Sequence, residues 1–185
     1  VYGMPAETPN HGAHALVNAP WTLAMNASPF GWNDVNGATG AEYTITRGNN
    51  VYASEDRDNN NSPGFSPDGG AALDFDFPVN LALEPIDYES AAITNLFYWN
   101  NIIHDVTYQY GFDEVSGNFQ GNNYGNGGAD GDEVDADAQD GSGTNNANFG
   151  TPPDGSNPRM QMFRWTQTTP ARDSDLDNGI IVHEY

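Results

Sequence analysis

Two neighbouring residues, His183 and Glu184, have side chains that can do metal-assisted chemistry together. They follow the apolar run Ile180-Ile181-Val182, which is typical of the buried first turns of a helix. A His-Glu pair is the first half of His-Glu-x-x-His, in which two histidines on one helical face bind zinc and the glutamate activates water. Half a motif has little specificity, because His-Glu pairs arise by chance as ordinary structural residues. The pair therefore needs support from the rest of the chain.

The composition limits which metals and partners such a site would take. Cysteine is absent, so a transition metal must be held by histidine and carboxylate. Lys+Arg number 5, all of them arginine, against 26 Asp+Glu, and the formal net charge is -21. Such a chain repels nucleic acids and anionic membranes and favours divalent cations and cationic peptides. No apolar run approaches the ~18 residues of a membrane span, and the acidic, lysine-free composition favours an extracellular location.

Other histidines have simpler explanations than metal binding. His104 and Asp105 fall within a predicted helix, where we expect a buried histidine with a satisfied hydrogen bond. His11 and His14 lie three residues apart in a Gly/Ala-rich stretch, where a solvated loop is the simpler interpretation.

Carboxylates are dense between residues 130 and 140 and resemble a calcium-binding cluster. They do not fit the EF-hand pattern, because the required glycine and final glutamate are missing from that register. Solvated charge is the simpler interpretation, and calcium stays open here and at Asp56-Arg57-Asp58. The six side chains are Asp130, Asp132, Glu133, Asp135, Asp137 and Asp140. Arg47 is expected to form a structural ion pair in so acidic a chain.

One strong helix is predicted over residues 90–111, with apolar residues at three- and four-residue steps and no internal glycine or proline. Asp87 or Ser90 can cap its first turn, and Gly111 suits a left-handed residue after its end. Residues 173–182 supply helix-starting aspartates and the apolar run, so His183 and Glu184 are expected near the start of a second helix.

Short strands between turn-forming residues are predicted elsewhere, from alternating β-branched, aromatic or long side chains. The candidates are residues 43–46, 51–53, 73–77, 133–138 and 159–165. We expect the last two to pair in one sheet.

Several stretches, in order along most of the chain, resemble the fungalysin family of secreted zinc endopeptidases, relatives of thermolysin in the gluzincin group. They include Ala27-Ser28-Pro29-Phe30-Gly31-Trp32, Thr46-Arg47-Gly48-Asn49-Asn50-Val51, Asn95-Leu96-Phe97-Tyr98-Trp99-Asn100-Asn101 with His104-Asp105, Gly117-Asn118-Phe119-Gln120, Gly143-Thr144-Asn145-Asn146-Ala147-Asn148-Phe149, Thr151-Pro152-Pro153-Asp154-Gly155 and Gly179-Ile180-Ile181-Val182-His183-Glu184-Tyr185. Six or more motifs in the same order are hard to obtain by chance. The resemblance therefore raises the weight of the His-Glu pair.

The resemblance implies a zinc enzyme that hydrolyses peptide bonds in polypeptide substrates. In that family the motif continues as His-Glu-Tyr-x-His-Gly, so His183 corresponds to the first zinc ligand and Glu184 to the catalytic base. The remaining ligands would follow Tyr185, in the protein's own missing C-terminal half. Asn146 and Ala147 resemble the edge-strand segment that binds an extended substrate through the asparagine amide and the alanine carbonyl. The alternative is that this Asn-Asn pair forms only a turn.

The fold implied by the resemblance is α+β. It is a thermolysin-like N-terminal lobe of strands and long loops, with one long helix at about 90–111 and the start of the active-site helix. Residues 1–185 would then be a single N-terminal catalytic lobe, truncated within the His-Glu-x-x-His helix. A different class stays open, because a catalytic zinc ion needs about three protein ligands. The chain would then be a catalytically inert fragment or an acidic, calcium-dependent extracellular binding module.

Overall fold

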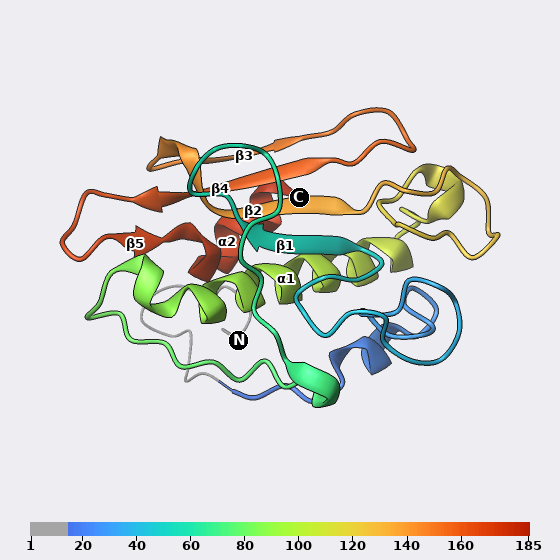
Figure 1. Ribbon diagram of the computed structural model, residues 1–185. Helices are drawn as coiled ribbons and strands as arrows, with labels where there is room; N and C mark the ends of the chain where they lie inside the picture. Colours follow the sequence, from blue (N-terminus) through green and yellow to red (C-terminus); the bar gives the residue numbers. More distant parts are fainter. Residues whose placement is uncertain (1–14) are drawn as a thin grey trace.

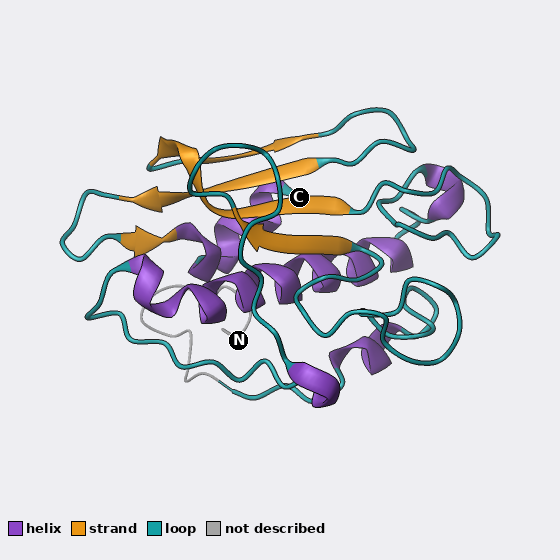
Figure 2. Ribbon diagram, in the orientation of Figure 1, coloured by secondary structure: helices purple, strands orange, loops and turns teal. Residues whose placement is uncertain are grey.

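A computed structural model describes residues 15–185, and Figure 1 traces them along the chain. A long helix, α1 (Glu89–Gln109), lies along one face of a curved five-stranded sheet, and the short helix α2 (Asn178–Glu184) packs beside α1. The strands are β1 (Val51–Glu55), β2 (Val134–Thr144), β3 (Ala147–Gly150), β4 (Arg159–Trp165) and β5 (Arg172–Asp173). Long loops and short 3₁₀ helices join these elements, as Figure 2 shows. The architecture is α+β, as predicted.

The sheet is mixed, with the strand order β1-β2-β4-β3 and with β5 paired to β4. The β1–β2 and β2–β4 pairs are parallel, whereas β3 and β5 each run antiparallel to β4. Parallel neighbours need a long crossover, and α1 with its flanking loops supplies the one between β1 and β2. Because β3 stands at one end of this order, it is an edge strand of the described sheet.

The hydrophobic core lies between the helices and the sheet. Ile93 and Leu96 of α1 are fully buried, at the three-residue spacing of one helical face. Met160 and Met162 of β4 are also fully buried, because alternate residues of a strand share a face. Ile181 of α2 has no exposed surface and joins the same cluster. The apolar start of α2 is therefore tied to the core by Ile181.

The helix prediction is confirmed, with a small shift of its start. α1 covers Glu89–Gln109, and Gly111 has a φ of 97°, a left-handed conformation that suits glycine. Ser90 is not the cap, because it lies inside the helix. Asp87 instead closes a capping box with Glu84 around the short 3₁₀ helix that precedes α1.

Three of the five predicted strands are confirmed. Residues 51–53 belong to β1, all of 133–138 except Glu133 lies at the start of β2, and 159–165 are β4. β2 and β4 pair in one sheet, as expected.

The predictions for 43–46 and 73–77 were wrong. Ile45 and Arg47 form only isolated bridges, Ile45 with Asp68 and Arg47 with Tyr52 of β1, because the chain turns directly after them at Gly48. In the other segment the Phe75 ring packs 6.2 Å from the Phe97 ring, so it is held by α1 and not by a neighbouring strand.

Within residues 15–185 no helix is long and apolar enough to cross a membrane. His11 and His14 lie outside the described residues.

Candidate active site

The helix α2 presents His183 and Glu184 on its last turn. Asp177 caps its start, and the Asp177 carboxylate accepts hydrogen bonds from the amides of Gly179 and Ile180 at 3.0 and 3.3 Å. Ile181 points into the core, while His183 is exposed and Glu184 half-buried. Ile181 therefore anchors the helix, and the two candidate catalytic side chains remain accessible.

The strand β3 carries the predicted substrate-binding residues at its start. Asn146 is exposed and precedes the strand, and Ala147 is buried and opens it. The carbonyl of Asn146 accepts a hydrogen bond from the Phe163 amide of β4 at 3.3 Å. In an antiparallel ladder the main-chain groups of successive residues point alternately to the two sides. The amide and carbonyl of Ala147 are therefore directed to the open edge.

Three aromatic rings join the end of α2 to β3. The Tyr185 ring stacks on Phe149, with centroids 5.8 Å apart, and meets Phe119 edge-on at 5.7 Å. Phe119 also contacts Phe149 at 5.8 Å. The structure thus brings the His183-Glu184 turn and the Ala147 edge onto neighbouring elements, which the separation in sequence does not reveal.

The donor chemistry of this turn suits a zinc ligand. His183 offers an exposed imidazole, and neutral imidazole nitrogens are common zinc ligands. Among the described residues, no group of three ligand-bearing side chains includes His183. Within residues 15–185, His183 is therefore a lone candidate ligand, with the Glu184 carboxylate beside it in sequence.

Comparison with known proteins fixes the family. The family model described as "Fungalysin metallopeptidase (M36)" matches residues 1–185. The chain belongs to the fungalysin family. It is 44% identical to extracellular metalloproteinase 2 of Trichophyton tonsurans and 46% identical to a probable extracellular metalloproteinase 2 of Arthroderma benhamiae, over 191 aligned residues in each case. All of this chain is covered, but it spans only 29% of the length of each of these relatives.

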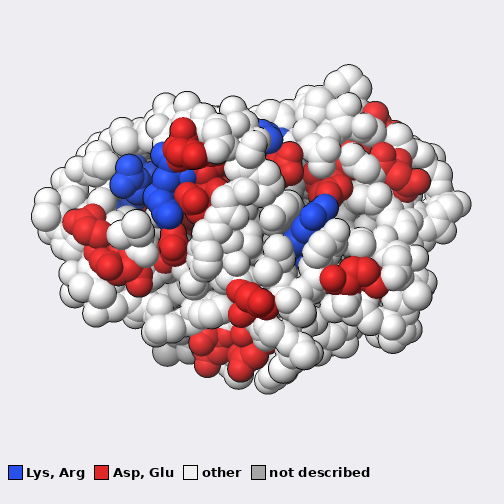
Figure 3. Space-filling view, viewed as in Figure 1, with Lys and Arg blue, Asp and Glu red and all other residues white. Residues whose placement is uncertain are grey.

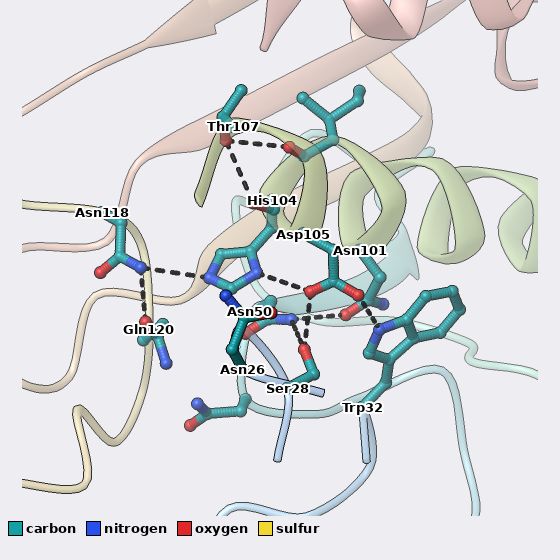
Figure 4. A network of polar contacts seen from close by, with 12 residues as sticks. Asn26, Ser28, Trp32, Asn50, Asn101, His104, Asp105, Thr107, Asn118 and Gln120 are labelled. Atoms are coloured by element: carbon teal, nitrogen blue, oxygen red, sulfur yellow. Dashed lines mark hydrogen bonds and ion pairs between the residues drawn. The ribbon is translucent and has the colours of Figure 1, made fainter. Parts of the chain in front are cut away.

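A buried polar network around His104 and Asp105 joins α1 to the loops that pack against it, as Figure 4 shows. The Asp105 carboxylate accepts hydrogen bonds from Ser28 Oγ at 2.7 Å and Trp32 Nε1 at 2.9 Å. His104 has no exposed surface; its Nδ1 lies 3.1 Å from Asp105 Oδ1 and its Nε2 lies 3.3 Å from Asn118 Nδ2. His104 is thus a satisfied core histidine, as predicted, and the network ties the early loop to α1.

A second set of buried amides continues this network. The Asn50 side-chain amide donates to Asn101 Oδ1 at 3.0 Å and to Ser28 Oγ at 3.2 Å. The Asn101 side-chain amide donates to the main-chain carbonyl of Phe97, one turn earlier in α1. Sequence reasoning assigned no individual role to Ser28, Asn50 or Asn101. For Asn101 the one signal was a polar residue at a position of α1 that the apolar period of the helix predicts to be buried.

The dense carboxylates between residues 130 and 140 do not form one calcium site. Asp132 accepts from the Gln120 and Gly155 amides at 2.9 and 3.0 Å, Asp130 from the Asn123 amide, and Glu133 lies 4.0 Å from Arg47. Arg47 also stacks on the rings of Tyr43 and Tyr52. The predicted structural ion pair of Arg47 is confirmed.

Asp137 and Asp140 lie instead beside Asp56, with carboxylate oxygens of all three within 4.8 Å of one another. Each carboxylate has donors within the protein. Asp56 accepts from the Asn60 and Asn61 amides, Asp137 from Arg159, and Asp140 from Ser142 and Gln161. Burial raises the pKa of Asp137 to about 6, although the Arg159 guanidinium opposes the shift. Figure 3 shows acidic side chains over several parts of one face, with basic ones in a few groups beside them.

Proposed function

We propose that this chain is the N-terminal part of a secreted zinc metalloendopeptidase that hydrolyses peptide bonds in proteins. The observation that carries the proposal is the position of α2, whose accessible His183 and Glu184 end beside the open edge of β3. Membership of the fungalysin family supports it, as do the names of the extracellular relatives. An extracellular location follows from the same names.

His183 would provide one zinc ligand, and the other ligands would come from the part of the relatives that this chain does not span. When bound, zinc supplies a Lewis acid that polarises the scissile carbonyl and acidifies water. Glu184, the next residue, takes a proton from the attacking water and delivers it to the leaving amine. Glu184 is half-buried, so part of its surface remains accessible.

The substrate would add to the sheet as a further strand at β3. The Ala147 carbonyl, directed to the open edge, accepts an amide of the extended peptide, and the exposed Asn146 amide binds the peptide backbone. This places the peptide along the edge strand next to α2. Residues 1–185 would act as one N-terminal lobe, with the C-terminal half of the same protein closing the cleft. The charge of -21 disfavours nucleic acids and membranes as partners.

The test uses a longer protein that contains this chain together with the following part of the relatives. Glu184→Gln should lower peptidase activity about 10²–10⁴-fold, while zinc content stays unchanged. His183→Ala should lower zinc content as well as activity. Val182→Ala, on the exposed side of the same helix, is the matched control and should leave both unchanged. Full activity in Glu184→Gln would overturn the role of Glu184.

The competing function is an inert lobe or a calcium-dependent binding module. Its best support is the group Asp56, Asp137 and Asp140. Because an ion that binds only the folded state stabilises it by mass action, calcium in excess would raise the Tm of such a module. A calcium-dependent rise in Tm that Asp140→Asn abolishes, in a longer protein without peptidase activity, would favour that function.

A further inference from the structure

The carboxyl group of Asp175 is the most completely buried acid near α2. Asp175 has no exposed surface, and among residues 15–185 neither of its carboxyl oxygens has a hydrogen bond of good geometry. It lies in the short 3₁₀ helix Ser174–Leu176, three residues before α2 begins. A buried carboxylate without a donor is costly, so its charge must be removed or balanced.

The carboxyl group of Asp173 faces Asp175. Asp173 is 5% exposed and accepts hydrogen bonds from Gln139 Nε2 at 2.7 Å and from the Asp175 amide at 3.0 Å. The two side chains are within hydrogen-bonding range of each other. The Asp173 carboxylate raises the pKa of Asp175, whereas the hydrogen bonds from Asp175 lower the pKa of Asp173. Two ionised carboxylates are both acceptors and cannot satisfy one another. One added proton would turn the contact into a hydrogen bond.

The charges around the pair do not balance a second negative charge. From β4, the exposed Arg164 lowers the pKa of Asp173. From β2, Gln139 offers its side-chain amide and its main-chain amide, both neutral. From α1 and α2, the groups that face this turn are the neutral amides of Asn95 and Asn178.

We propose that Asp173 and Asp175 share one proton and form a pH-sensitive latch that holds the start of α2. Burial and the neighbouring carboxylate of Asp173 together hold the pKa of Asp175 well above its ordinary value of 3.8. Below the raised pKa of Asp175, the pair keeps the shared proton. Loss of that proton places two negative charges in a dry site and opens the pair.

The latch acts on α2 through Asn95 of α1. The Asn95 Nδ2 donates to the main-chain carbonyl of Asp175 at 2.7 Å and to the Asn178 side chain at 2.8 Å. Asn178 is the first residue of α2. A displacement of Asp175 therefore weakens the pair of Asn95 hydrogen bonds that holds the first turn of α2, the helix that carries His183 and Glu184.

The sign of the effect follows from the direction of the shift. The pKa of Asp175 is raised on folding, so its contribution to stability is complete below pH 3.8. As the pH rises above that value, the unfolded chain ionises Asp175 and the folded chain does not. Stability is then lost progressively until the pH passes the folded pKa, where the latch opens.

The experiment compares thermal unfolding of the full chain with that of Asp175→Asn between about pH 4 and about pH 8. Asparagine is neutral and keeps a donor toward Asp173. The Tm of the natural chain should fall relative to that of Asp175→Asn by at least about 3 °C over this range. Asp76→Asn, which changes an exposed carboxylate, should show no such difference. A difference between Asp175→Asn and the natural chain that does not change with pH would overturn the proposal.

A second measurement does not depend on the stability of the variant. Infrared difference spectra should show a protonated carboxyl band near neutral pH in the natural chain that is lost in Asp175→Asn. Calcium titration separates a shared proton from a bound cation. A calcium-dependent rise in the Tm of the natural chain, absent in Asp175→Asn, would mean that the pair binds a cation and would refute the latch. No change with calcium, together with the infrared band, supports it.

Discussion

The ring of Tyr185 stacks on the ring of Phe149, with centroids 5.8 Å apart and an angle of 26° between their planes. This contact joins the helix that carries His183 and Glu184 to the edge strand that begins at Ala147. Ring contacts of this kind fix both distance and orientation. The spacing between the proposed base and the proposed substrate strand is therefore set by packing between two side chains that do no chemistry.

Separating these rings should uncouple the helix from the strand. Phe149→Leu and Tyr185→Leu each keep apolar volume and remove the stack, and a double-mutant cycle in urea should give a coupling of about 0.5–1.5 kcal/mol. Additive effects of the two substitutions would contradict a direct energetic link. In the longer protein each variant should lower kcat/KM even where the fold is retained.

The start of α2 should depend on the Asp177 cap. Its carboxylate accepts from the Gly179 and Ile180 amides. Asp177→Ala should therefore lower the free energy of unfolding by about 1 kcal/mol. Hydrogen exchange at these two amides should rise in the same variant. Asp177→Ser is the matched control, because serine retains a capping oxygen, and an equal loss in both variants would argue against capping.

The buried Asp105 should be more costly to change than its partners. Asp105→Asn removes the charge and part of the acceptor set for Ser28 and Trp32, and should lower the free energy of unfolding by about 2–3 kcal/mol. Ser28→Ala removes one donor and should cost about 1 kcal/mol. Urea unfolding measures both. If the two variants lose equal stability, Asp105 does not organise the network.

The stability of the chain should fall with rising pH through the titration of Asp137. Its pKa is raised by burial from 3.8 to about 6, so its favourable contribution is complete below pH 3.8 and is lost as the pH rises to about 6. The loss attributable to this group should reach up to about 3 kcal/mol. NMR titration of the side-chain carboxyl carbon reads the pKa directly. Asp137→Asn should remove this part of the pH dependence, and an ordinary pKa would contradict the prediction.

The sequence by itself determined the elements whose signal is local. The three- and four-residue apolar period defined α1, and Asp177 followed by Ile180-Ile181-Val182 defined the start of α2. Alternating side chains identified β1, the first part of β2, and β4. Local periodicity is readable because each residue's face depends only on the geometry of its own element. The ordered motifs also pointed to the fungalysin family, which the family match established.

Only the tertiary structure decided what lies beside what. The order β1-β2-β4-β3 makes β3 an edge strand. The four residues of β3 are too few to show an alternation of apolar and polar side chains that would predict a strand. The segment 73–77 has that alternation, yet it packs against α1 through Phe75. The contact Phe149–Tyr185 depends on long-range packing, as do the partners of Asp105 and the complete burial of Asp175. Such pairings minimise the free energy of the assembled core, and no local pattern encodes them.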